Sequence, residues 1–172
     1  STVPQNAGTH TVKAVVAETD NYAAGEATSE FTIAKADIQL VVSIDNWTYG
    51  DEAKAPSVTG NSGNGTVTYT YANTAAPSLV YESTVPSAAG SYSVKAVVPA
   101  TTNYNGGEAT ASFTIAKADF SLVTIADIAD QTYIGSQITP AVTVTFKGKT
   151  VDASEYTVSY GENKNVGEGT VT

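Results

Sequence analysis

The sequence contains no cysteine, no methionine and no arginine, and it has a single histidine and a single tryptophan. The absence of cysteine excludes a disulfide framework and thiol-based metal sites, although it does not assign a cellular compartment. With no methionine and no basic leader, the chain is expected to be an internal fragment of a longer protein, with any signal or anchor lying outside it.

The charge is strongly acidic, because 17 aspartates and glutamates stand against eight lysines and give a net charge of −9. Recognition of phosphate groups relies on a basic face and on arginine forks, and this chain would instead repel a polyanion. Surface carboxylates of this kind keep an extended protein soluble. The charge therefore predicts no nucleic-acid partner.

Helical patterns are also missing. No window has the apolar spacing of an amphipathic helix, and no apolar run is long enough to enter a membrane. Threonine, valine, alanine and tyrosine are abundant, whereas leucine occurs three times, and this balance favours strands. The sequence therefore predicts an all-β protein without membrane insertion.

An internal repeat organises the chain. The seven residues Phe31–Asp37 return unchanged as Phe113–Asp119, and residues 1–37 align with residues 83–119 without a gap. A period of 82 residues is too long for a solenoid unit and suits a small β-sandwich. The repeat therefore marks the ends of domains.

The period divides the chain into three units. Residues 1–35 are the C-terminal strands of an Ig-like repeat, residues 36–117 are a complete Ig-like repeat, and residues 118–172 are the N-terminal part of a third, related repeat. Alternating or apolar segments predict strands at 10–16, 27–33, 38–44, 66–71, 78–82, 90–98 and 109–115. The prediction is a row of tandem antiparallel Ig-like β-sandwich domains, one complete and two partial.

Four residues of the complete repeat are predicted to be structural. Tyr92 follows a glycine and precedes the inward-facing Val94 by two residues, which is the layout of a tyrosine corner, so its hydroxyl is expected to bond the backbone. Phe113 and Ile115 face inward on the closing strand.

The sequence offers no catalytic group. His10 is the only histidine, and Tyr92 takes the equivalent place in the second copy, which favours a structural role for both. No nucleophile with a base and an orienting group can be assembled. The glycine-rich segment Gly60–Gly65 is followed by a strand and lacks the lysine of a phosphate loop, so it is interpreted as a turn. We expect no enzymatic activity and no cofactor.

Three features suggest a binding or covalent role, and each has a simpler interpretation. Trp47 and Tyr49 form an aromatic platform for a sugar ring in one interpretation, whereas a lone tryptophan in a sandwich is more often a core or junction anchor. Lys13 and Lys95 alternate with inward positions and should face water, which disfavours a lysine–asparagine isopeptide bond. Aspartates near the domain boundaries suggest junction calcium, but without ligand-loop spacing no metal is expected (Asp37, Asp45, Asp51, Asp119, Asp127 and Asp130).

Three segments carry a family resemblance: Trp47–Asp51, Ala89–Val94 and Asn103–Lys117. Together they resemble the immunoglobulin-like repeats of Gram-positive bacterial surface proteins, the MBG domains of Tyr-Gly-x type. The resemblance implies an extracellular, wall-attached setting, neighbouring repeats in the same chain as partners, and no known catalysis. The expected function is a structural stalk or spacer of an adhesin-like protein, and the alternative is a module that binds carbohydrate or a host protein, with the ligand unknown.

The partial end units are complementary in content. Residues 1–35 supply the last two strands of a sandwich, and residues 120–172 supply the strands that precede them. Unpaired edges and apolar faces favour donation of strands between chains. The fragment is therefore expected to associate by strand complementation, head-to-tail or as a reciprocal dimer, and to lose this association in a full-length protein that contains the missing strands.

Overall fold

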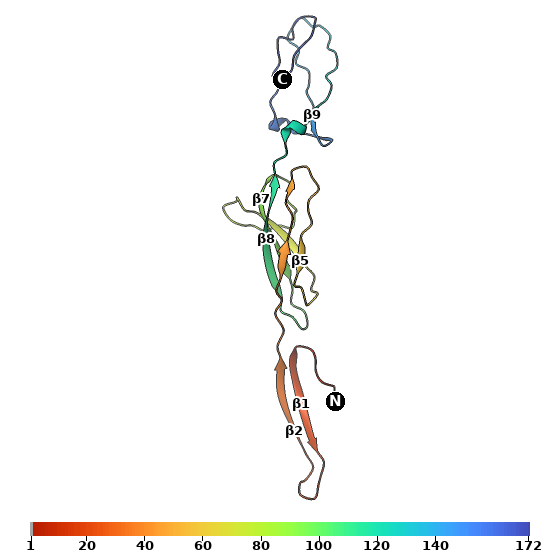
Figure 1. The fold of residues 1–172 in the computed structure, drawn as a ribbon, viewed down its shortest axis with the longest axis vertical. Helices are drawn as coiled ribbons and strands as arrows, with labels where there is room; N and C mark the ends of the chain where they lie inside the picture. The colour runs from red at the N-terminus through yellow and green to blue at the C-terminus, as the bar shows by residue number, and fades with distance from the viewer. Residues whose placement is uncertain (1) are drawn as a thin grey trace. The chain divides into compact units, whose positions relative to one another are not determined.

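The computed structural model describes residues 2–172 and divides into two compact units, Ser1–Lys117 and Ala118–Thr172. Its regular elements are strands, apart from two single turns of 3₁₀ helix (Figure 1). The prediction of an all-β, sandwich-like protein is confirmed. Within residues 2–172, no helix is long and apolar enough to cross a membrane.

The first unit begins with a two-stranded antiparallel hairpin, β1 (Gly8–Val16) and β2 (Gly25–Ile33). β1 is rich in threonine and valine, whose branched side chains suit the pleat of a strand. The loop between the strands closes through a bond from the amide of Thr19 to the carbonyl of Tyr22, 2.8 Å long.

The rest of the first unit, which we call the middle repeat, contains two sheets. The smaller sheet pairs β3 with β5, and the larger has the order β4-β8-β7-β6 with β4 parallel to β8. Their bounds are β3 (Val41–Ser43), β4 (Trp47–Thr48), β5 (Ser57–Thr59), β6 (Thr68–Asn73), β7 (Gly90–Val98) and β8 (Gly107–Ala116). Figure 1 labels β5, β7 and β8 in this repeat.

The core of the middle repeat is built on aromatic rings. Phe113 stacks on Trp47 and on Tyr92, with ring centroids 5.0 and 5.6 Å apart. Tyr71 meets the edge of Phe113, and burial raises the pKa of its phenol, with a smaller contribution from Tyr69. The buried cluster comprises Val42, Trp47, Tyr71, Tyr92, Val94, Ala96, Phe113 and Ile115.

Two predicted strands are shorter in the structure. The strand predicted at 38–44 pairs only over Val41–Ser43, because its partner β5 is equally short, although Ile38, Leu40 and Ile44 remain half-buried. The strand predicted at 78–82 is reduced to one bridge, in which Glu82 exchanges two backbone bonds with Tyr71.

The second unit contains a small antiparallel sheet of order β11-β10-β9. Its strands are β9 (Thr124–Ile125), β10 (Val144–Phe146) and β11 (Lys149–Thr150). Two 3₁₀ turns, η1 (Phe120–Leu122) and η2 (Ala153–Glu155), begin after Asp119 and Asp152, whose carboxylates accept the amides of Ser121 and Ser154 at 2.9 Å. The two ends of β10, Val144 and Phe146, are buried.

Candidate functional site: the junction between repeats

Asn103 lies in the loop between β7 and β8 and fastens that loop to the start of the hairpin. Its Oδ1 accepts the backbone amide of Ala7 at 2.8 Å, and its Nδ2 donates to Oδ1 of Asn6 at 3.0 Å. One amide side chain therefore uses both its acceptor and its donor to join segments that are almost one hundred residues apart in sequence.

The segment that leaves the hairpin is bonded to the same loop. Nζ of Lys35 donates to the carbonyl of Thr101 at 2.7 Å. The amide of Ala36 donates to the carbonyl of Asn103 at 2.9 Å, and the carbonyl of Ala36 accepts the amide of Asn105 at 2.8 Å. The linker therefore runs beside the loop as a short stretch of parallel pairing, in which Ala36 faces Tyr104.

Asp37 completes this contact with a charge-assisted bond. Its Oδ1 accepts Nδ2 of Asn105 at 2.7 Å, which is short for a bond between nitrogen and oxygen. Bonds to ionised groups are roughly twice as strong as neutral ones. The three residues Lys35, Ala36 and Asp37 thus each bond the loop of the repeat that they enter.

The loop that receives the linker has a fixed shape. The amide of Thr101 donates to the carbonyl of Tyr104 at 2.9 Å, and the predicted turn at Gly60–Gly65 packs against both residues. A Cβ at Gly63 would lie 2.9 Å from Oγ1 of Thr101 and 2.9 Å from Cβ of Tyr104. Only glycine allows this close approach, so the turn supports the junction loop.

His10 and Tyr92 make the same contact in the two copies. The Tyr92 hydroxyl donates to the carbonyl of Ala88 at 2.9 Å, which is the backbone bond expected of a tyrosine corner. Nε2 of His10 lies 2.8 Å from the carbonyl of Asn6, also four residues earlier, and a carbonyl acceptor requires this nitrogen to carry the proton. The histidine therefore holds Asn6 in place. The next residue, Ala7, donates its amide to Asn103.

Trp47 and Tyr49 are not brought together as a platform. Trp47 is 7% exposed and its ring stacks on Phe113, so it has no face for a ligand, whereas Tyr49 is 49% exposed. The chain turns after β4, where Gly50 has a φ of 84° and the amide of Asp51 donates to the carbonyl of Thr48. This turn breaks the strand alternation that would align the two rings, and a binding role for the pair stays a prediction.

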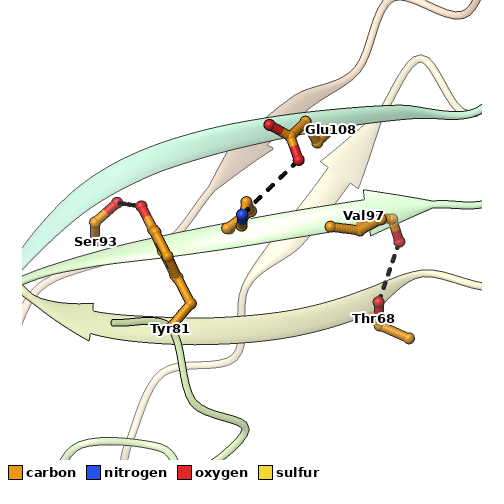
Figure 2. A network of polar contacts seen from close by, with 6 residues as sticks. Thr68, Tyr81, Ser93, Val97 and Glu108 are labelled. Carbon is orange, nitrogen blue, oxygen red and sulfur yellow. Dashed lines mark hydrogen bonds and ion pairs between the residues drawn. The ribbon is translucent and has the colours of Figure 1, made fainter. Parts of the chain in front are cut away.

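Lys95 is more covered than the sequence predicted. Its side chain is 28% exposed, its Nζ lies 4.6 Å from the centre of the Tyr81 ring, and it pairs with Glu108 at 3.8 Å. Figure 2 shows Tyr81 reaching Ser93, with its hydroxyl 3.0 Å from Oγ. The equivalent Lys13 pairs with Glu26 in the hairpin, and its side chain is more exposed, at 50%.

Two of the boundary aspartates, Asp37 and Asp119, accept hydrogen bonds from protein groups. Asp37 accepts from Asn105, and hydrogen bonds from the side chain and then the backbone of Ser121 hold the pKa of Asp119 below its usual value. Among residues 2–172, no three histidine or acidic side chains lie close enough to hold a metal ion.

Sequence reasoning missed the role of Asn103. The signal was present, since the pair Asn103-Tyr104 recurs as Asn21-Tyr22 and both pairs lie in loops closed by the same threonine-to-tyrosine bond. The atoms that Asn103 bonds belong to Asn6 and Ala7, which lie far away in the sequence, so no local pattern identified them.

Comparison with known protein families gives a match over much of the chain. A family model described as an MBG domain matches residues 1–37 and 41–119, which together exceed half of the chain, and residues 120–172 lie outside the match. No curated protein matches the chain. No solved structure matches it either.

Proposed function

This chain belongs to the MBG domain family, and we propose that its repeats form a structural stalk or spacer of an adhesin-like protein. In this proposal the repeats are of the Tyr-Gly-x type, are extracellular and are attached to the cell wall of a Gram-positive bacterium. The sequence motifs that resemble such surface proteins support this setting. The partners of each repeat are its neighbours along the chain.

The single observation that carries the proposal is the bonded junction. A spacer must transmit direction from one repeat to the next, and a flexible glycine- or serine-rich linker would not do so. Here Lys35, Ala36 and Asp37 are all bonded to the loop that follows β7, and Asn103 bonds the hairpin as well. Each bond contributes only about 1 kcal/mol, but several together restrict a three-residue linker.

Each repeat of this fold also adds length to a stalk. Ten extended residues at the strand rise span about 35 Å, so each added repeat lengthens a stalk by roughly that amount. An acidic surface supports the role, since like charges keep neighbouring stalks apart.

Nuclear magnetic relaxation of the backbone tests the junction. We expect order parameters near 0.85 for the amides of Ala7 and Ala36, the value of a rigid backbone. Asn103→Ala should lower the order parameter of Ala7, whose amide bonds that side chain, and leave Ala36 ordered. Asn21→Ala is the matched control at the equivalent loop and should change neither.

The result against the proposal would be a flexible junction. Order parameters below about 0.6 at both amides in the unmodified chain would make the linker a free tether. The stalk would then lack the stiffness that the hydrogen bonds imply.

A glycan array addresses the alternative function. A binding module needs an exposed platform, and the burial of Trp47 leaves Tyr49 as the exposed ring of the pair. We expect no reproducible glycan binding by the chain. Hits that disappear in Tyr49→Ala, with the fold intact, would favour the carbohydrate-binding function over the spacer.

A further inference from the structure

The first and last stretches of the middle repeat are bonded to each other in parallel at two places. Ala36 pairs with Tyr104 where the chain enters the repeat, and Trp47 pairs with Ile115 where the chain leaves it. The partners are 68 residues apart in sequence at both places. Because this separation is the same, the entering and the leaving stretch contain equal numbers of residues between the two contacts.

The first of these places, which we call the entry contact, comprises the bonds of Lys35, Ala36 and Asp37 to the loop between β7 and β8. Ala36 bonds Asn103 and Asn105 through its backbone, at 2.9 and 2.8 Å. The charged side chains on either side of it each add a bond of 2.7 Å. Bonds of a parallel pairing run across the two stretches, so they oppose movement of one stretch along the other.

The second place, which we call the exit contact, is the pairing of β4 with the end of β8 and one bond on each side of it. The amide of Tyr49 donates to the carbonyl of Ala116 at 2.8 Å. On the other side, Oδ1 of Asn46 accepts the amide of Thr114 at 2.7 Å. The asparagine side chain therefore takes the place of a backbone acceptor and lengthens a short ladder.

Packing at the exit contact opposes the same movement. Trp47 is buried in β4, and its ring stacks on Phe113 of β8 with centroids 5.0 Å apart. Its pairing partner Ile115 is also buried. A slip of one residue between two paired strands moves each side chain to the opposite face. Sliding of β4 along β8 would therefore remove Trp47 from its stack.

The parallel direction decides how tension acts on the repeat. Tension along a row of repeats pulls the entering stretch backwards at Lys35 and the leaving stretch forwards at Lys117. Because the two stretches run in the same direction, this pull slides one along the other, and the bonds of a contact must break together. Terminal strands in antiparallel pairing would instead be opened from one end, one pair after another.

We propose that the middle repeat resists tension in shear, with the entry and exit contacts holding its first and last stretches against sliding. This inference rests on the spacer function, because a spacer is the element that transmits tension between an anchor and a tip. Equal numbers of residues between the contacts allow both contacts to share the tension. The repeat would therefore stay folded under a pull along the chain that would open it in other directions.

Single-molecule stretching at constant force tests the direction dependence. The chain has no cysteine, so handles can be attached at introduced pairs of cysteines. Ala34→Cys with Lys117→Cys gives end-to-end pulling, and Thr66→Cys with Ala100→Cys pulls apart the antiparallel pair β6–β7 at its open end. All four sites are exposed. We expect unfolding at the same force to be at least about tenfold slower in end-to-end pulling, since several bonds must break together.

Two asparagine variants test the exit contact itself. Asn46 and Asn73 each accept one backbone amide through Oδ1, from Thr114 at 2.7 Å and from Ala75 at 2.9 Å. Asn46→Ala should unfold about fivefold faster in end-to-end pulling, whereas the matched control Asn73→Ala, outside both contacts, should not. Without tension, the two variants should lower the melting temperature by similar small amounts, because each loses one exposed bond.

Two results would overturn the proposal. The first is unfolding that is no slower in end-to-end pulling than in the pulling of β6 from β7. The second is an Asn46→Ala chain that unfolds under tension no faster than the Asn73→Ala chain. Neither result bears on the spacer function, which is judged by the order of the junction amides without tension. A rigid junction beside a repeat that opens easily would keep the spacer and refute the resistance to tension.

Discussion

The hairpin β1–β2 and the pair β7–β8 have nearly the same structure in two different environments. Their registers are identical after displacement by the repeat period, and their lysine–glutamate pairs occupy equivalent positions. Their corner bonds run from His10 and Tyr92 to carbonyls four residues earlier. Their burial is opposite, since one face is open and the other is the core of a sandwich.

The difference teaches that local sequence dictates pairing, whereas burial comes from the covering sheet. Turn residues and alternating side chains are sufficient to align two strands. A two-stranded hairpin alone is marginal in water. In the middle repeat, the pair β7–β8 is joined by β3, β4, β5 and β6. The stability of a repeat therefore depends on long-range contacts that the hairpin cannot supply.

The largest expected effect compares the two phenylalanines. Phe113→Ala should destabilise the middle repeat by about 3–5 kcal/mol, because it removes the ring on which Trp47 and Tyr92 stack. Phe31→Ala should change the stability of the middle repeat by less than about 0.5 kcal/mol. Denaturant unfolding followed by Trp47 fluorescence reports both, and an equal cost at the two positions would contradict the comparison.

An intermediate effect is expected at the corner. Tyr92→Phe should cost about 1 kcal/mol, because the carbonyl of Ala88 loses its donor while the ring remains. Tyr133→Phe is the matched control at an exposed ring and should leave the melting temperature unchanged. An unchanged melting temperature in Tyr92→Phe as well would remove the corner from the account of stability.

The smallest effect concerns acid and the second unit. Serine hydrogen bonds lower the pKa values of Asp119 and Asp152, so each carboxylate stabilises the folded unit above its usual pKa of 3.8. That contribution is lost as the pH falls through the lowered values. We expect the amide resonances of Ser121 and Ser154 to shift below pH 3.8. Asp119→Asn should remove the transition at Ser121 and leave that at Ser154.

Much of the middle repeat was predictable from sequence. The strand predicted at 90–98 is β7, and the residues predicted to face inward, Tyr92, Val94, Phe113 and Ile115, are buried. These predictions succeeded because alternation and repetition are local signals. The result gives weight to period and register as predictors of the closing hairpin.

The remaining features depend on contacts without a local signal. Composition favoured a core or junction position for Trp47, but the parallel pairing with Ile115 that places it there has no periodic signal in the short β4. The bond from Asn103 to Ala7 joins a loop to a distant segment. A polar residue in a loop has many possible partners, so its sequence does not identify the one that it bonds.

Amide hydrogen exchange in dilute solution tests the central claim, that a repeat is stable where its hairpin is covered by its companion sheet. The measurement compares matched amides of β1 and β7, such as those at His10–Val16 and Tyr92–Val98. We expect the β7 amides to exchange only through global unfolding of the middle repeat and the β1 amides to exchange through local opening with a free energy near zero. Equal protection of the two strands in dilute solution would contradict the claim.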